Sequence, residues 1–177
     1  MAVIEAIATT YLEADTATVT FSSLGSYEHL QLRISSKSDR NYQWDPIRIA
    51  FNADTGSNYT YHALIGEGSS ESVGYATGFT AALTIDGTAG GSGQSASDYG
   101  ISIVDILDYR NTNKNTTILC INGRLSYTSA PVWSSGVSLS GAFWDNTAAV
   151  TSIALSVQNG TNFVRGSEFT LYGWASS

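Results

Sequence analysis

Only two histidines, His29 and His62, could act as general bases at neutral pH in this chain of 177 residues. Each stands in a run of alternating apolar and polar residues: His29 precedes Leu30, and His62 lies between Tyr61 and Ala63. That setting is typical of ordinary strand or surface histidines. No Gly-x-Ser-x-Gly, Walker or His-Glu-x-x-His motif occurs in the sequence. We therefore expect no catalytic residues, and no cofactor or metal.

A pair of carboxylates is the better enzymatic candidate, because glycosidases place two of them roughly 5–10 Å apart. Asp105 and Asp108 stand in the run 103–109 at odd spacing, so an unbroken strand would send them to opposite faces. We interpret Asp105 as an acid near the rim of a strand and Asp108 as a turn-forming residue. A glycan depolymerase that uses either carboxylate is kept as a third alternative.

The run Asn52–Asn58 superficially resembles the oxygen-rich start of a calcium-binding loop. The acidic residue that completes an EF-hand at its twelfth position would fall on Ala63, so that motif fails. Asp and Asn side chains that hydrogen-bond to their own hairpin loop explain the run better.

Aromatic residues are more numerous than one small core needs, with four Trp and ten Tyr. Several stand beside proline in segments that we interpret as loops. Exposed aromatic rings suit a protein interface or a sugar platform, because flat rings bury much area at low entropic cost. Plugging the open ends of the fold is the alternative role. The candidate interface or glycan-contact residues are Tyr42, Trp44, Pro46, Pro131, Trp133 and Trp174.

Alternation with a period of two recurs along the whole chain, and sustained helical periodicity does not occur. The pattern predicts an all-β protein: an antiparallel, jelly-roll-like β-sandwich of about ten strands with little or no helix. In the last strand, Phe169 and Leu171 share one face, while Glu168 and Thr170 share the other. The expected strands cover residues 3–11, 18–21, 30–34, 47–51, 59–65, 79–85, 101–107, 118–121, 137–144, 153–157 and the end of 163–174.

The longest break in the alternation is the Gly- and Ser-rich segment 86–98, which we interpret as a surface loop. Because alternation resumes at Ile101, one domain over residues 1–177 is expected. The single cysteine, Cys120, stands in an apolar run and is expected to be a buried thiol.

The formal net charge of −7 and the pI of about 4.5 argue against nucleic-acid binding, which needs Lys and Arg to neutralise phosphate. No run approaches the ~20 apolar residues of a membrane span. The first residues also lack the pattern of a signal peptide. We therefore expect a soluble protein, made in the cytoplasm, that binds neither nucleic acid nor membrane.

Five segments, in order and spread over nearly the whole chain, resemble a family of small virion structural proteins of tailed bacteriophages, common among phages of aquatic bacteria. This chain departs from the family pattern at Glu168, where a basic residue is usual, and at Trp174, where an aliphatic one is usual. The resembling segments are 18–24, 27–34, 49–59, 104–109 and 166–173.

The resemblance implies a jelly-roll-like sandwich that functions by assembly, as a head decoration protein or part of a tail fibre, and it supplies no catalytic residues. Because the chain is acidic and shows no coiled-coil heptads, we favour a cement protein on the outer capsid surface. Its partner would be the major capsid protein, and a homotrimer is expected by analogy with capsid symmetry. The alternative is a receptor-binding module of a tail fibre or baseplate that recognises host surface glycans through Trp44, Trp133 and neighbouring tyrosines.

Overall fold

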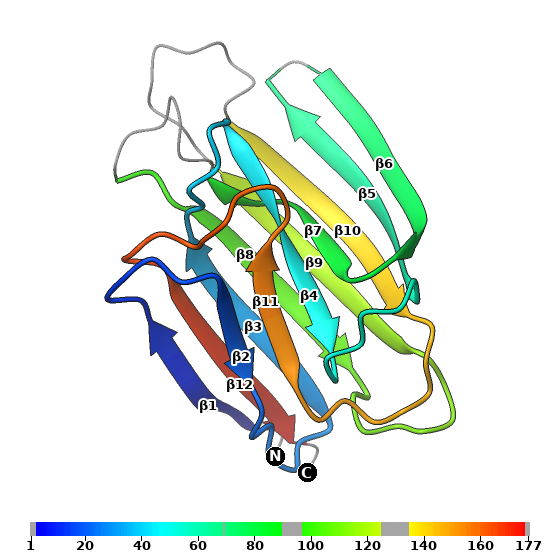
Figure 1. Cartoon of the computed structure of the whole chain (residues 1–177). Coiled ribbons are helices and arrows are strands. Elements are labelled where there is room, and N and C mark those ends of the chain that lie inside the picture. The colour runs from blue at the N-terminus through cyan, green and yellow to red at the C-terminus, as the bar shows by residue number, and fades with distance from the viewer. Residues whose placement is uncertain (1–2, 69, 90–96, 125–134, 176–177) are drawn as a thin grey trace.

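Two antiparallel sheets of eight and four strands build the protein, as the computed structural model shows for residues 3–68, 70–89, 97–124 and 135–175 (Figure 1). No helix occurs in these ranges, and they therefore contain no helix that is long and apolar enough to cross a membrane. The strands are β1 (Val3–Tyr11), β2 (Thr18–Phe21), β3 (His29–Ser36), β4 (Trp44–Phe51), β5 (Tyr59–Glu67), β6 (Ser70–Phe79), β7 (Ala82–Ala89), β8 (Gly100–Leu107), β9 (Thr116–Arg124), β10 (Gly136–Trp144), β11 (Ile153–Val157) and β12 (Glu168–Ala175).

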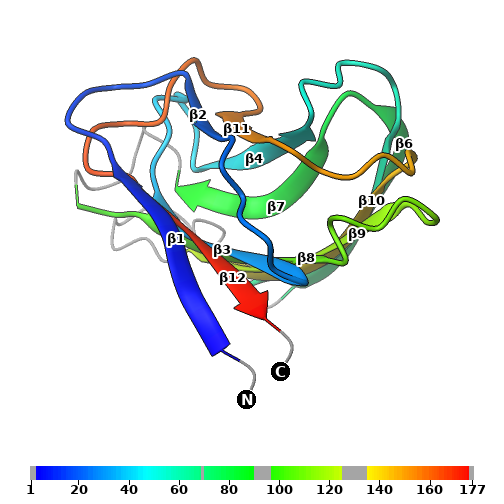
Figure 2. The same ribbon diagram turned by 90° about the horizontal axis from the view of Figure 1, so that it is seen from below.

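The order of strands in the larger sheet is β1-β12-β3-β8-β9-β10-β5-β6, and in the smaller sheet it is β2-β11-β4-β7. Seen from below, the smaller sheet covers one face of the larger one (Figure 2). β1 pairs with β12 and β2 pairs with β11, so the two ends of the chain return to each other in a nested, jelly-roll-like manner. The predicted all-β sandwich is thus confirmed.

The core lies between the two sheets and is formed by the inward positions of the alternating strands. On β4, Ile47, Ile49 and Phe51 are fully buried, and they face Leu30 and Leu32 of β3 within one cluster. Burial of each such side chain stabilises the fold by roughly 1.5–3 kcal/mol. The apolar face of each alternating strand therefore packs against the apolar face of the opposite sheet. The buried thiol of Cys120 belongs to the same cluster, and burial raises its pKa to about 12. The expectation of a buried core thiol is therefore confirmed.

An aromatic group closes the core beneath the β4–β5 connection. The ring of Trp144, at the end of β10, stacks on Tyr59 with centroids 6.3 Å apart and lies 5.7 Å from Phe51. The Tyr59 hydroxyl accepts a hydrogen bond from the backbone N–H of Phe51. This tryptophan therefore belongs to the core and not to a surface, which agrees for Trp144 with the alternative role of the aromatics.

Two strand predictions need correction. β6 was not predicted, because Ser70–Phe79 offers few apolar residues and contains Gly74 and Gly78. The single strand predicted over 79–85 is instead the end of β6, a turn at Thr80 and Ala81, and the start of β7. In the segment predicted as a loop over 86–98, β7 continues to Ala89, and residues 90–96 lie outside the described ranges.

Candidate interaction surface

The face of the eight-stranded sheet that points away from the smaller sheet carries large apolar side chains. On β9 and β10, exposed and buried residues alternate strictly. The exposed positions hold Leu119 and Ile121 on β9, and Val137, Leu139 and Phe143 on β10. Because successive side chains of a strand point to opposite faces, all five project outward. A solvated sheet face normally carries polar side chains there, so this composition needs an explanation.

Five apolar residues of this sheet lie directly opposite one another in consecutive strand pairs. Val73 of β6 is opposite Leu64 of β5, which is opposite Leu139 of β10; Leu139 is opposite Ile121 of β9, and Ile121 is opposite Ile103 of β8. Val73 and Leu64 are 69% and 56% exposed. With strands about 4.8 Å apart, this apolar row crosses roughly 20 Å of the sheet.

The apolar row and its neighbours form the outer apolar face, defined by Leu64, Val73, Ile101, Ile103, Leu119, Ile121, Val137, Leu139 and Phe143. Eight of these nine residues are at least 37% exposed. A contiguous group of large exposed apolar side chains on one face of a protein is a feature of interaction sites. The outward positions of β5, β9 and β10 hold no Asp, Glu, Lys or Arg.

Glycines leave two hollows in this face, because they carry no side chain. A groove of about 440 Å³ runs over Leu64, Gly66, Val137 and Ile121, and it is lined almost entirely by apolar atoms. A second hollow of about 480 Å³ includes Gly141, where a Cβ atom would meet no other atom within 4 Å. Apolar ridges that alternate with hollows can receive the side chains of a partner surface.

The other half of the same sheet is more polar, and two of its charged side chains, Arg33 and Asp105, are held by contacts within the sheet. Gln31 on β3 donates from Nε2 to Asp105 Oδ1 on β8 over 2.8 Å, and it accepts from Arg33 Nε over 3.0 Å. The Arg33 guanidinium lies over the Tyr172 ring, 4.9 Å from its centroid. Asp105, two residues before the end of β8, is thus held by a hydrogen bond from the neighbouring strand β3.

The outward face of the four-stranded sheet provides the contrast. Its outward positions on β2 and β11, and at Arg48 and Ala50 of β4, hold small or polar residues; Trp44, at the start of β4, is half-buried. Arg48 there donates from Nη1 to Gln158 and from Nη2 to Thr80. The apolar outward composition is therefore specific to one side of the molecule. The residues at these positions are Thr18, Thr20, Arg48, Ala50, Ala154 and Ser156.

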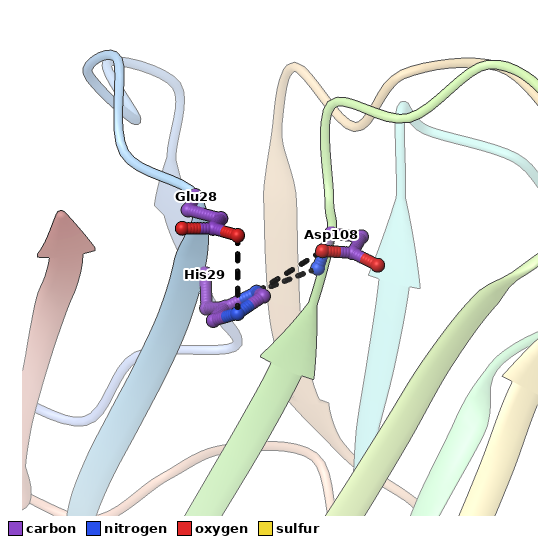
Figure 3. A group of neighbouring side chains, drawn as sticks. All are labelled: Glu28, His29 and Asp108. Carbon is purple, nitrogen blue, oxygen red and sulfur yellow. Dashed lines mark hydrogen bonds and ion pairs between the residues drawn. The ribbon is translucent and has the colours of Figure 1, made fainter. Parts of the chain in front are cut away.

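A cluster of titratable side chains forms where β3 begins and β8 ends. Glu28, His29 and Asp108 point toward one another there (Figure 3). The backbone N–H of Asp108 donates to His29 Nδ1 over 3.0 Å, and His29 Nε2 lies 3.9 Å from Glu28 Oε1. His29 therefore receives a hydrogen bond that fixes the chain as it leaves β8.

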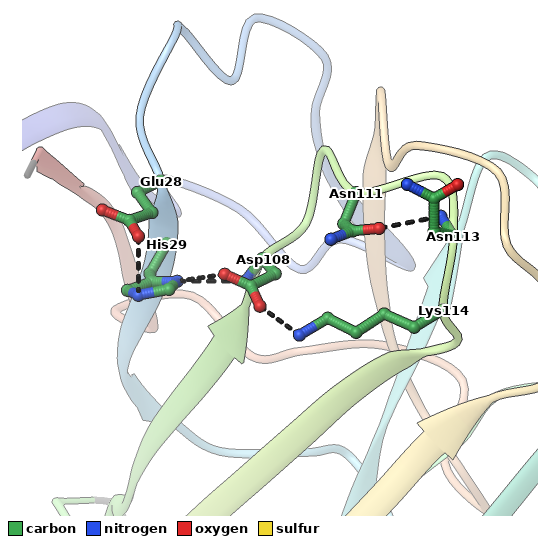
Figure 4. A network of polar contacts seen from close by, with 6 residues as sticks. All are labelled: Glu28, His29, Asp108, Asn111, Asn113 and Lys114. Carbon is green, nitrogen blue, oxygen red and sulfur yellow. Dashed lines mark hydrogen bonds and ion pairs between the residues drawn. The ribbon is translucent and has the colours of Figure 1, made fainter.

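Lys114 completes this cluster by an ion pair with Asp108 (Figure 4). Its hydrogen bond to the carboxylate is the largest influence that lowers the pKa of Asp108. Asp108 also has a φ of 49°, in the left-handed region that Asp tolerates in turns. A metal ion would have to displace both Lys114 and the backbone N–H on His29, so we interpret the cluster as a structural turn, as predicted for Asp108.

Two of the six candidate contact residues lie together. Tyr42 is 49% exposed, and its ring meets that of half-buried Trp44 edge to face with centroids 6.2 Å apart. The guanidinium of Arg40 covers both rings, at 4.5 Å from the Tyr42 centroid and 5.3 Å from that of Trp44. Arg40 is anchored by a hydrogen bond from Nη1 to the carbonyl of Trp44.

The other described candidates, Pro46 and Trp174, lie elsewhere. Pro46 is buried within β4, so its ring is not on the surface where the sequence interpretation placed it. Trp174 is 37% exposed and lies opposite His29 on the polar half of the larger sheet. Pro131 and Trp133 fall outside the described residues. The described candidates therefore do not form one continuous surface.

The run Asn52–Asn58 is closed by its own side chains. Asp54 accepts hydrogen bonds from the Gly56 backbone N–H and from Asn58 Nδ2, over 2.8 and 2.9 Å. Its Oδ2 also accepts the indole N–H of Trp144 over 2.6 Å. The expectation of a hairpin loop stabilised by Asx contacts, and not an EF-hand, agrees with this geometry.

The sequence interpretation did not predict the outer apolar face. Where both the odd-numbered and the even-numbered residues of a strand are apolar, alternation does not say which of the two sets is buried. A signal for such a face was present in the run Ile118-Leu119-Cys120-Ile121, where the residues of both faces are apolar, as in a strand covered on both sides. Comparison of the chain with models of protein families and with curated proteins found no match.

Proposed function

We propose that this chain is a structural protein of a tailed-bacteriophage particle that decorates the outside of the capsid, as its resemblance to small phage virion proteins implies. The outer apolar face carries the proposal. An apolar surface of this size, on one side of a small sandwich only, is what a protein that functions by docking on a partner needs. The partner is the major capsid protein.

The composition of the face indicates how docking would work. The outward positions of β5, β9 and β10 hold no Asp, Glu, Lys or Arg, and Glu71 of β6 is the charged residue that lines the groove beside them. A partner that leaves Glu71 at the hydrated edge covers this face without burying an unpaired charge. The polar half beside it, with Arg33 and Asp105, would form the hydrated rim. The formal net charge of −7 favours the outer capsid surface over a place against packed DNA.

Capsid binding should depend on the outer apolar face. Leu139→Lys places a charge at its centre, where Leu139 is 47% exposed, so the fold is expected to tolerate the change. Thr20→Lys is the matched control, because Thr20 is exposed on the outward face of the other sheet. Binding is measured by co-sedimentation with expanded capsids from which this protein is missing. We expect Leu139→Lys to weaken that binding at least tenfold and Thr20→Lys to leave it unchanged.

Equal binding by both variants would contradict this role of the face. The copy number of the chain in purified virions gives a second test, by quantitative mass spectrometry against the major capsid protein. Copies in the range of the capsid protein support decoration of the shell, whereas a trace amount contradicts it and moves the protein to the tail.

Glycan recognition is the second candidate function, and the exposed Tyr42 favours it. A flat exposed ring beside a guanidinium is a feature of sugar-binding surfaces, although Arg40 already covers part of both rings here. This candidate predicts that the isolated protein adsorbs to host cells, that soluble surface polysaccharide inhibits adsorption, and that Tyr42→Ala weakens it. Adsorption that is unaffected by Tyr42→Ala would argue against this site.

A further inference from the structure

β6 is an edge strand with no partner on its outer side among the described residues. It ends the order of the eight-stranded sheet and pairs only with β5. Its residues are exposed or half-buried on both faces, and Val73 and Tyr75 are 69% and 77% exposed. Its outer row of backbone N–H and C=O groups can therefore pair with another strand.

The other edges are better protected against such pairing. β2 has only four residues, and the pairings of β1 and β7 contain register shifts at Ala6/Ala8 and at Asp45/Ile47. β6 has ten residues, contains no Lys, Arg or Pro, and has one charged residue, Glu71. Its own register shift lies near its end, so the stretch from Ser70 to Ala76 is regular. Natural edges normally carry at least one of these protections.

We propose that β6 pairs antiparallel with β6 of a second copy of this chain, with the two-fold axis beside Val73. In this register Val73 lies opposite Val73 of the second copy, and Glu71 lies opposite Tyr75. The pairing closes on itself, because each copy offers the same edge to the other. It depends on the β6 edge and not on the proposed capsid role.

The properties of the strand select this register. Val73 is the last residue of the apolar row, so the pairing makes the row of one copy continuous with that of the other. The two Glu71 carboxylates stay four positions apart, roughly 13 Å along the strands. A pairing centred on Glu71 would place these like charges opposite each other, which destabilises a strand pair.

Charge at the proposed axis gives the first test. Val73→Lys places two lysines opposite each other, whereas Val137→Lys is a matched control at a valine that is 64% exposed on β10, away from the edge. Sedimentation equilibrium at about 100 µM should give twice the mass of the chain. We expect Val73→Lys to raise the dimer dissociation constant at least tenfold, and Val137→Lys to leave it unchanged.

Cross-linking tests the register. Directly opposite residues of antiparallel strands have Cα atoms about 4.5–5.5 Å apart, a separation that a disulfide can span. Oxidised glutathione should therefore link Val73→Cys into a covalent dimer, in which two thiols lose their protons as the glutathione disulfide is reduced. Tyr75→Cys should not link, because its counterpart lies roughly 13 Å away. The natural Cys120 is buried and does not interfere.

Each remaining outcome overturns the proposal. A chain that stays monomeric at 1 mM, or that forms a trimer, does not pair through β6. A dimer that Val137→Lys abolishes and Val73→Lys leaves intact is held together by the outer apolar face. Cross-linking of Tyr75→Cys without cross-linking of Val73→Cys means that the register is wrong.

Discussion

Asp54 and Trp144 form a contact between a loop and the core that can be measured directly. The indole N–H of Trp144 is buried with its ring and donates to Asp54 over 2.6 Å. Loss of a hydrogen-bond partner leaves a buried donor unsatisfied, which costs about 1–3 kcal/mol. We expect Asp54→Ala to lower the free energy of unfolding by that amount in urea titrations. In a double-mutant cycle with Trp144→Phe, the combined loss should be smaller than the sum.

The same contact predicts a pH dependence. Hydrogen bonds from Asn58, Trp144 and Gly56 lower the pKa of Asp54 below its usual range. The stabilisation is therefore complete above the ordinary pKa of an aspartate and is lost as the pH falls below it toward the pKa of the folded state. The unfolding free energy of Asp54→Ala should vary less with pH in this acid range. Parallel profiles for the two proteins would contradict this assignment.

On the scale of the strand, β9 carries two neighbouring apolar residues with opposite roles. Ile118 is 1% exposed in the core, whereas Leu119 is 43% exposed on the outer apolar face. Ile118→Ala should lower the free energy of unfolding by about 2–5 kcal/mol through the cavity it leaves. Leu119→Ala should change it by no more than about 0.5 kcal/mol. Chemical denaturation of both variants measures the difference, and similar losses would mean that the two faces are assigned wrongly.

Most strands could be predicted because alternation in runs such as Leu30–Ile34 and Ile47–Phe51 reflects burial on one side only. β6 could not, since an edge strand exposed on both faces has no buried face to leave a pattern. The ends of β7 were also misjudged, because Gly87 was taken as loop punctuation although the strand includes it.

The candidate site was less predictable than the fold. The sequence interpretation looked for exposed rings beside proline, and of these Pro46 proved to be buried in β4. The outer apolar face depends on which strands become neighbours, and alternation fixes faces without fixing neighbours. Only the assembled order of β8, β9, β10, β5 and β6 brings Ile103, Ile121 and Leu139 into one row.

On the scale of the whole molecule, net charge should oppose pairing of two copies. Each chain carries a formal charge of −7, and two copies repel each other most strongly when few ions screen them. Raising NaCl from about 0.05 to 0.5 M should therefore tighten the β6-mediated dimer in sedimentation equilibrium. Weaker association at high salt would mean that oppositely charged groups hold the copies together, which β6 with its single Glu71 does not offer.

The homotrimer expected from the resemblance stays a prediction, and the same sedimentation masses distinguish it from a dimer. The two surfaces proposed for contact are separate in kind. The outer apolar face buries side chains, whereas the β6 edge pairs backbone groups. Because Val73 belongs to both surfaces, Val73→Lys should affect both contacts, whereas Leu139→Lys should weaken capsid binding and leave self-pairing unchanged.

The position of β12 between β1 and β3 has a consequence for how the chain can be made. Thr9 of β1 is hydrogen-bonded to Thr170 of β12 across 161 residues of sequence, and among the described strands only β12 pairs with β1. While a ribosome is still adding the residues between them, β1 has no strand to join and β3 keeps an open side. Such long-range pairing slows folding and leaves strand edges open to aggregation. Completion of this side of the sheet thus waits until β12 has left the ribosome, and nascent chains stalled before Glu168 should be the species that chaperones hold.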